Sequence, residues 1–468
     1  MNDASEQYYQ ARIPIYPRSV RGRFRSLKWG ILALAYGVYF ALPWLRWNRE
    51  YGPEQAVMFD IPGRRFYLFD LVVYPQDIFW LAGFLMIAAV LLFLVTGVAG
   101  RVFCGYFCFQ TLWTDVYMFI ERVIQGERPA RMRLDKQPWG VSKVLKKGAT
   151  HASWLLVAFA TGLTFTLYWA DAGELVVQFF TGEAPFPAYA TTLFLTTTTY
   201  MMAGLAREQV CTYMCPYARF QAVMFDRDTL IVSYDERRGE GTTGRAKAGG
   251  GLRTREARQA AGAGDCIDCG YCVQVCPTGI DIRDGLQYQC IHCALCIDAC
   301  DNIMDRMGWP RGLIRYTSER ALEGGKTRYL KSKTLGYSAA LLIMTGLLIW
   351  SIATQAPLDA TVMQVRQPLH VQLSDGSIQN SYEIRVNNKT QRPVELKVAL
   401  DGPPDMTLDL GRVERIRLQP EHGTTLLARV RYQVPAGQSG PFDLTFRIVP
   451  QDTDEIPTLE MPAHFYVP

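Results

Sequence analysis

The sequence predicts an α-helical integral membrane protein of about five spans, with a cysteine-rich insert and a C-terminal immunoglobulin-like β-sandwich. Three observations support this fold class. Apolar residues gather in runs of about 18–20, the length that crosses a bilayer. All 12 cysteines lie between Cys104 and Cys300. Residues 356–468 instead alternate apolar and polar side chains, which is typical of half-buried strands.

Composition narrows the class of protein. The 468 residues are 49% hydrophobic and 20% charged, which excludes a mainly disordered chain. The net charge of +5 gives no indication of nucleic-acid binding. Because the cysteines are clustered rather than spread through an exported domain, they indicate metal or redox chemistry and not a disulfide framework.

Four apolar runs qualify clearly as transmembrane helices, and a fifth is less apolar because it contains four consecutive threonines. The clear runs are residues 29–45, 78–98, 153–170 and 335–354, and the fifth is 188–206. Residues 103–120 are apolar too, but Gln110 and Asp115 interrupt them. We expect that segment to form a helix at the membrane interface or inside the bundle.

Lysine and arginine in the short loops set the orientation of the spans. Basic residues are abundant before residue 29 and in the loop that follows residue 98, whereas residues 171–187 contain none. We therefore expect a multi-pass protein of the bacterial inner membrane with a cytoplasmic N-terminus and a periplasmic C-terminal domain. All the cysteines then face the cytoplasm, where thiols stay reduced.

Two cysteine runs repeat each other at a fixed offset. They are Cys266-x2-Cys269-x2-Cys272-x3-Cys276-Pro277 and Cys290-x2-Cys293-x2-Cys296-x3-Cys300. This spacing is typical of two 4Fe–4S clusters that exchange their fourth ligand. The prediction is one cluster on Cys266, Cys269, Cys272 and Cys300, and another on Cys290, Cys293, Cys296 and Cys276. A pair of zinc sites is the alternative, but zinc ribbons rarely show this triplet-plus-one pattern.

Two further cysteine pairs share CxxxC spacing, and we take them as candidate catalytic residues. They are Cys104 with Cys108, and Cys211 with Cys215, the latter followed by Pro216. If each pair is helical, its Cβ atoms lie about 5–6 Å apart on one face. That separation is too wide for a relaxed disulfide and suits two thiolates on a soft ion such as Cu(I). The two pairs can also converge into one four-sulfur site. Ordinary buried cysteines are the alternative.

These motifs divide the chain into six predicted segments. They are a basic tail (1–28), a four-span bundle with both CxxxC motifs (29–236), a flexible linker (237–264) rich in glycine and arginine, a two-cluster ferredoxin-like domain (265–334), a fifth span (335–354) and an immunoglobulin-like domain (355–468). His292 adjoins Cys293, but each cluster already has four cysteines. We expect His292 to be a surface residue or a neighbour of the cluster and not a ligand.

The combination of basic tail, spans, CxxxC motifs, the ferredoxin run 264–280, the segment 307–316 and the outer β-domain resembles the FixG/RdxA family of membrane polyferredoxins, which includes cytochrome c oxidase accessory proteins. The resemblance covers nearly the whole chain. It implies reduction of Cu(II) to Cu(I) for loading the copper centre of a cbb-type oxidase. The family's copper-linked CxxxCP motifs correspond to Cys104/Cys108 and Cys211/Cys215, with Phe109 in place of the first proline.

The resemblance also implies partners: copper-handling proteins, cbb-type oxidase subunits and a cytoplasmic electron donor that the sequence does not identify. The lipid bilayer is a further partner, and the sequence leaves open whether the chain is a homodimer. Two other functions stay open. One is a quinol dehydrogenase subunit that relays electrons to a partner reductase, and the other is a non-catalytic scaffold for oxidase assembly.

Overall fold

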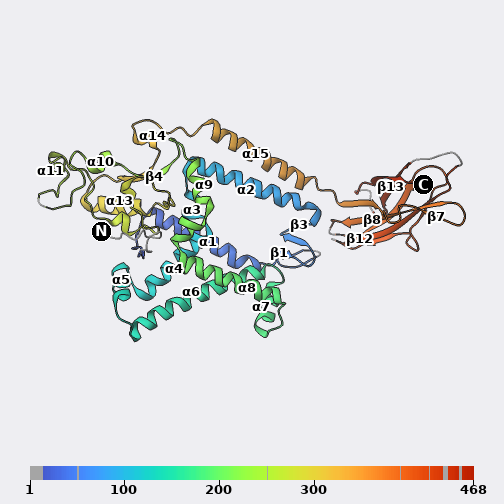
Figure 1. Cartoon of the computed structure of the whole chain (residues 1–468), viewed down its shortest axis with the longest axis horizontal. Coiled ribbons are helices and arrows are strands. Elements are labelled where there is room, and N and C mark those ends of the chain that lie inside the picture. The colour runs from blue at the N-terminus through green and yellow to red at the C-terminus, as the bar shows by residue number, and fades with distance from the viewer. Residues whose placement is uncertain are drawn as a thin grey trace, which may run out of the picture. The chain divides into compact units, whose positions relative to one another are not determined.

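A computed structural model describes residues 14–49, 52–249, 251–390, 392–420, 422–435, 441–452 and 456–467. Residues 1–13 of the predicted basic tail therefore lie outside the described residues. The chain forms two compact units (Figure 1). Of the described residues, the first unit contains 14–47 and 54–348, and the second contains those from 349 to 467 together with 48, 49, 52 and 53.

Three helices among the residues described are long and apolar enough to cross a membrane: α2 (Ile78–Ala99), α6 (Val141–Leu167) and α15 (Ser332–Ala353). They correspond to three of the five predicted spans. The helix α1 (Arg23–Ala41) begins before its predicted span. The helix α8 (Phe186–Thr199) has 14 residues and continues as the π-helix η3 (Tyr200–Ala206). The count of five spans is thus not confirmed.

The segment 103–120 lies inside the bundle, broken at Cys108 into α3 (Val102–Tyr106) and α4 (Phe109–Gln125). The helix α4 packs against α6 and η3. Its Asp115 is 3% exposed and accepts two 2.9 Å hydrogen bonds from Arg25 of α1, while the Lys28 Nζ lies 3.4 Å away. This buried ion pair explains how α1 carries two cations within the bundle. The end of the predicted tail is therefore packed and not free.

Short elements complete the first unit. These are η1 (Leu42–Trp44), β1 (Val57–Asp60), β2 (Arg65–Leu68), β3 (Leu71–Val73), η2 (Pro75–Asp77), α5 (Arg128–Lys136), α7 (Ala172–Thr181), η4 (Val210–Met214), α9 (Pro216–Met224), β4 (Ile231–Tyr234), α10 (Glu236–Glu240), α11 (Arg255–Ala260), α12 (Tyr271–Gln274), η5 (Ile282–Asp284), α13 (Leu295–Met307), β5 (Ile314–Thr317) and α14 (Glu319–Leu322). The strands β4 and β5 flank the cysteine-rich segment in the sequence and pair with each other. The cysteine-rich domain therefore begins before residue 265.

The segment 237–264 differs from the flexible linker that its composition predicts. It contains most of α10 and all of α11, and Arg258 of α11 is fully buried. Arg258 donates hydrogen bonds to the carbonyl oxygens of Gly264 and Cys266, each at 2.8 Å. Composition alone does not predict this packing because an arginine counts as polar, although its five donors can satisfy buried carbonyls. The segment is packed as part of the cysteine-rich domain.

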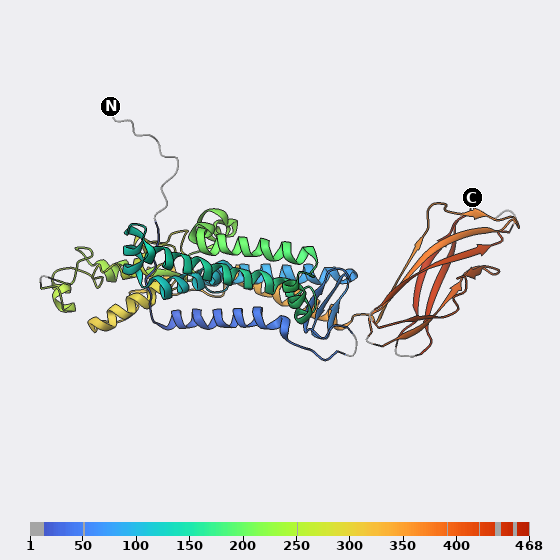
Figure 2. The ribbon, with the colours of Figure 1, turned by 90° about the horizontal axis from the view of Figure 1, so that it is seen from below.

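The second unit is a β-sandwich, as the alternating pattern predicts (Figures 1 and 2, orange to red). Its strands are β6 (Leu358–Gln364), β7 (Val371–Gln372), β8 (Ile378–Asn388), β9 (Val394–Asp401), β10 (Thr407–Asp409), β11 (Ile416–Leu418), β12 (Gly423–Tyr432), β13 (Phe442–Pro450) and β14 (Leu459–Phe465). One antiparallel sheet has the order β10-β12-β8-β6 with β7 on β8, and the other has the order β11-β9-β13-β14. Tyr382, Phe446 and Phe465 are fully buried in its core.

Candidate iron–sulfur and four-cysteine site

The sequence repeat of the cysteine runs is also a repeat of backbone conformation. Asp268 and His292 each precede the second cysteine of their run, and both are left-handed, with φ of 50° and 51°. Gly270 and Ala294 each follow that cysteine and are left-handed as well, with φ of 64° and 58°. The helices α12 and α13 then begin. These paired reversals curl each backbone segment, so that its first three cysteines can face one bound group.

The structure brings the eight cysteines of the two runs into two adjacent groups. The first group surrounds Cys300, and the second group surrounds Cys296. Cys300 interacts electrostatically with Cys272, Cys266 and Cys269 of the first run. Cys296 interacts with Cys293 and Cys290 of its own run, and also with Cys276 and Cys272. The last cysteine of each run therefore lies near cysteines of the other run. Cys269 is exposed, whereas Cys266, Cys290 and Cys293 are buried.

The surroundings of these cysteines fit thiolate-ligated clusters. The cavity at the second group is lined by cysteines and by apolar side chains such as Val232, Ile280 and Leu295. Burial raises the pKa of Cys272 and of Cys290 to about 12. A free thiolate is costly in such an environment, and a bound metal removes that cost by deprotonating and pairing the sulfur. The donor set is the soft sulfur set that iron–sulfur clusters take.

A buried hydroxyl gives a second indication at the first group. The Tyr234 hydroxyl is buried and has no hydrogen-bond partner of ordinary geometry among the described residues. The Cys266 thiol is its electrostatic neighbour, and burial together with that thiol raises the pKa of Tyr234. A thiolate or cluster sulfur at this position accepts a hydrogen bond that a protonated thiol accepts only weakly. The position of the buried Tyr234 hydroxyl beside Cys266 therefore fits a ligated Cys266.

The two CxxxC motifs share one conformation that differs from a single helical face. Cys104 lies in α3 and Cys211 in the π-helix η4, whereas Cys108 and Cys215 are extended and precede α4 and α9. Each pair therefore straddles a helix break, and the i, i+4 face expected for one continuous helix is wrong. Cys108 has φ −65° and ψ 124°, close to the −81° and 109° of Cys215. The bend thus forms at the first motif although Phe109 replaces proline.

The two CxxxC motifs come together in space. Cys104 interacts electrostatically with Cys108, Cys211 and Cys215, and Cys211 interacts with Cys108 and Cys215. We call these four residues the four-cysteine site. All four are half-buried. Among the described residues, no three His, Cys, Asp or Glu side chains are close enough to hold a single metal ion in the arrangement shown.

The helix α3, which contains Cys104 of the four-cysteine site, packs against the second cysteine run. The Tyr106 hydroxyl donates a 3.1 Å hydrogen bond to the carbonyl oxygen of Cys293. A Cβ atom added at Gly105 lies 2.7 Å from the Ile291 carbonyl oxygen and 3.0 Å from the Cys293 Cα. Cys104 packs in the same apolar cluster as Cys293. Only a glycine permits this approach, so the sequence places the two sulfur sites within one packed contact.

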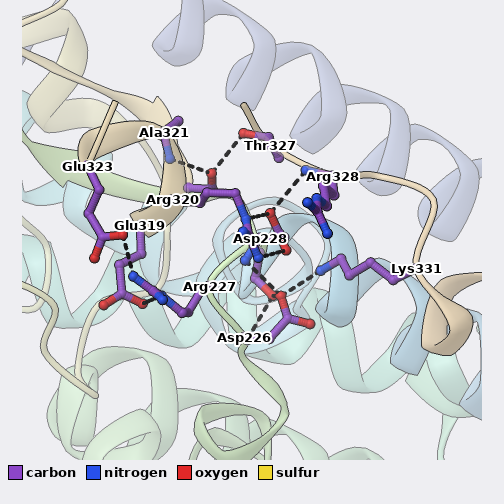
Figure 3. Close-up of polar contacts among 12 residues, drawn as sticks. Asp226, Arg227, Asp228, Glu319, Arg320, Ala321, Glu323, Thr327, Arg328 and Lys331 are labelled. Carbon is purple, nitrogen blue, oxygen red and sulfur yellow. Dashed lines mark hydrogen bonds and ion pairs between the residues drawn. The ribbon is translucent and has the colours of Figure 1, made fainter. Parts of the chain in front are cut away.

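An ionic network ties the cysteine-rich domain to the start of α15 (Figure 3). Asp228 accepts hydrogen bonds from the Arg320 side chain at 2.6 and 2.9 Å and from the Arg328 amide at 3.0 Å. Asp226 accepts one from Lys331 at 2.6 Å. These residues come from the loop before β4 and from the segment between β5 and α15. The network therefore helps to fix the domain against the helical bundle.

Sequence reasoning missed Arg101, a residue that lies between the two sulfur sites. It is 2% exposed, and its amide donates a 3.0 Å hydrogen bond to Nδ1 of His292. His292 is fully buried and so is not a surface residue. In the sequence, Arg101 is one of many basic residues in the loop that predicts the orientation of the spans. Its position shortly before Cys104 was the available signal, but its contacts lie far away in the sequence, so no local pattern reveals them.

Family models match three parts of the chain. A 4Fe-4S dicluster domain matches residues 206–319, a 4Fe-4S binding domain matches residues 81–125, and an IG-like fold at the C-terminal of FixG matches residues 348–468. The two 4Fe-4S matches together include all 12 cysteines. With the apolar helices, these domains define the class: the protein is a membrane iron–sulfur protein that transfers electrons.

Curated relatives identify the family. Protein RdxB of Cereibacter sphaeroides is 44% identical over 412 residues, covering 86% of this chain and 85% of that protein. The nitrogen fixation protein FixG of Rhizobium meliloti is 38% identical, covering 98% and 94%. Protein RdxA of Cereibacter sphaeroides is 41% identical, covering 92% of both chains. The chain belongs to the FixG/RdxA family, as the motifs predict.

A solved structure of a FixG-related protein from Vibrio parahaemolyticus also matches, with 20% identity and a TM-score of 0.22. The matched region covers 24% of this chain and 97% of the Vibrio parahaemolyticus chain. The family assignment rests on the curated relatives and not on this partial match.

Proposed function

We propose that this chain is a cupric reductase of the bacterial inner membrane. It carries single electrons from a cytoplasmic donor through two 4Fe–4S clusters to Cu(II) bound at the four-cysteine site. The observation that carries the proposal is the packed contact between α3 and the second cysteine run. There the Tyr106 hydroxyl bonds the Cys293 carbonyl at 3.1 Å, and Cys104 shares an apolar cluster with Cys293.

The ligand sets that we propose follow the crossed arrangement of the cysteines. The first cluster is held by Cys266, Cys269, Cys272 and Cys300, and the second by Cys290, Cys293, Cys296 and Cys276. The electrostatic neighbours of Cys300 support the first set, and those of Cys296 support the second. When bound, such clusters supply reversible one-electron storage. The chain's own residues enclose the second group and leave Cys269 of the first group exposed.

The four-cysteine site supplies ligands that favour the product of the proposed reaction. Reduction of Cu(II) to Cu(I) consumes one electron per ion and transfers no proton. Thiolates are soft ligands that prefer Cu(I), so their binding energy favours the reduced ion. Because Cys108 and Cys215 stand at helix breaks, their extended backbones can adjust to a bound ion more easily than a helix interior can.

We further propose the cellular setting that the resemblance implies. The N-terminus and the cysteines face the cytoplasm, and the β-sandwich faces the periplasm. Copper-handling proteins receive the Cu(I) for a cbb-type oxidase, and a cytoplasmic reductant supplies electrons at the exposed Cys269 side. Support comes from the loop charges and from the confinement of cysteine to residues 104–300.

The test is anaerobic reduction of Cu(II) by purified, prereduced protein, followed with a chromogenic Cu(I) chelator. The double variant Cys211→Ser/Cys215→Ser should keep its iron and its cluster absorbance but lose at least about ten-fold in rate, because the copper site loses half its thiolates. Tyr213→Phe, a change between the same two cysteines that keeps both thiols, is the matched control. An unchanged rate in the double variant with full iron content removes the thiols from the mechanism.

A third iron–sulfur cluster at the four-cysteine site is a second candidate, favoured by one observation. The 4Fe-4S binding domain model covers residues 81–125, where Cys104 and Cys108 are the cysteines present. Iron analysis separates the two proposals. Two clusters require about eight irons per chain and three require about twelve. A content near twelve that falls by about four in the double variant supports the third cluster.

A further inference from the structure

Arg101 is a buried cation without a carboxylate partner. The residue comes directly after the glycine that caps α2, and it is 2% exposed. In the part of the chain that the structure describes, no Asp or Glu forms an ion pair with it, and its Nε has no hydrogen-bond partner. An unpaired buried charge is costly, so its retention needs a compensating negative charge.

Arg101 joins its own segment to two others by hydrogen bonds from its side chain and its backbone amide. Its two terminal nitrogens donate to the carbonyl oxygens of Tyr288 and Ala218. Tyr288 lies just before the second cysteine run, and Ala218 lies in α9, just after the four-cysteine site. The Arg101 amide donates to His292 Nδ1 at 3.0 Å. One residue therefore connects the second cysteine run with both parts of the four-cysteine site.

Cysteines are the partners that can supply the compensating charge. The thiols that interact electrostatically with the guanidinium are those of Cys104, Cys290, Cys211 and Cys215. Three belong to the four-cysteine site and one to the second run. Neutral thiols leave the cation uncompensated, whereas metal-bound thiolates pair with it. The surroundings of Arg101 therefore favour the ligated, anionic state of both sites.

We propose that Arg101 is a positioning residue for electron transfer between the two sulfur sites. Its contact with two carbonyls holds the loop before Cys290 against α9, and its charge stabilises the added electron at either site. This inference rests on the proposed function in that both sites bind metal. Removing the charge should lower the reduction potential of the second cluster, because net charge near a cluster sets its potential.

The test compares Arg101→Gln and Arg101→Lys in the full-length, purified protein. EPR-monitored redox titration measures the cluster potentials, and stopped flow measures reoxidation of the reduced protein by Cu(II). Arg101→Gln should shift the potential of one cluster to more negative values. Arg101→Lys should keep the potential near that of the wild type but slow reoxidation about ten-fold, since lysine keeps the charge without the planar two-donor fork.

Arg385→Gln, which removes an exposed cation from the β-sandwich, controls for overall charge and should change neither readout. An Arg101→Gln protein with wild-type iron and unchanged potentials overturns the charge role. If that variant loses its iron, the lysine variant decides: wild-type reoxidation in Arg101→Lys overturns the positioning role, and slower reoxidation with full iron supports it. Loss of iron in both variants overturns the electron-transfer role, because Arg101 would then serve cluster assembly. Wild-type protein that binds no iron refutes the proposed function instead.

Discussion

Replacing Gly105 by alanine tests the contact on which electron transfer is proposed to depend. The new Cβ would stand 2.7 Å from the Ile291 carbonyl oxygen and 3.0 Å from the Cys293 Cα. Both neighbours are backbone atoms, which cannot swing aside as a flexible side chain can. Since ordinary carbon contacts begin at about 3.5 Å, α3 and the cysteine loop must move apart by roughly 0.5–1 Å. We expect a destabilisation of about 1–3 kcal/mol, typical of overpacking.

The assay is the unfolding midpoint of the detergent-solubilised protein, together with its rate of reoxidation by Cu(II). Gly148→Ala is the matched control, because Gly148 also lies in a helix and its added Cβ would meet nothing within 4 Å. That substitution should be neutral or stabilising by up to about 1 kcal/mol. If Gly105→Ala is as stable and as fast as Gly148→Ala, α3 does not approach the cysteine loop this closely.

Buried charges and the helix breaks give three further predictions. Asp115→Asn should destabilise the protein by about 3–5 kcal/mol in chemical unfolding, because Arg25 and a neighbouring lysine keep their buried charges without the carboxylate; a loss below about 1 kcal/mol would contradict the buried pair. The hydrogen bond from Arg320 lowers the pKa of Asp228 to about 2. The stability that the ionised Asp228 carboxylate contributes is therefore complete above about pH 4 and is lost as the pH falls toward about 2. The unfolding midpoint of Asp228→Asn should accordingly depend less on pH within that window, and an identical pH profile would refute the assignment. Phe109→Pro should change the unfolding free energy by less than about 1 kcal/mol, because Phe109 is the first residue of α4 and is 70% exposed; loss of folded protein would show that the two motifs are not equivalent.

The cysteine runs and the β-sandwich were predictable because their signals are local. Ligand spacing within 266–300 and the alternation within β8 both lie in single stretches of sequence. The left-handed conformations at Asp268 and Ala294 were not predicted, since neither residue type requires a positive φ. They arise because the backbone reverses on both sides of the second cysteine in each run. The repeated cysteine spacing in the sequence reflects this repeated turn.

Other features depend on partners far away in the sequence. Arg25 and Lys28 reduce the apparent hydropathy of α1, and only the structure shows that Asp115 compensates them. The packing of 237–264 likewise depends on backbone carbonyls that Arg258 satisfies. The four-cysteine site depends both on a local sequence pattern and on contacts between distant segments. Each CxxxC pair is visible in the sequence, but their convergence is set by how α3 and η4 pack.

The difference in exposure between the two cysteine runs has a consequence for selectivity. Cys269 reaches solvent, while Cys290 and Cys293 are enclosed by protein. A soluble redox protein can approach the first sulfur group directly but is kept at a distance from the second. In the proposed function, the protein around Cys290 thus keeps soluble redox proteins away from the second group. An electron that arrives from the cytoplasm therefore passes to the four-cysteine site and not to an unrelated acceptor in solution.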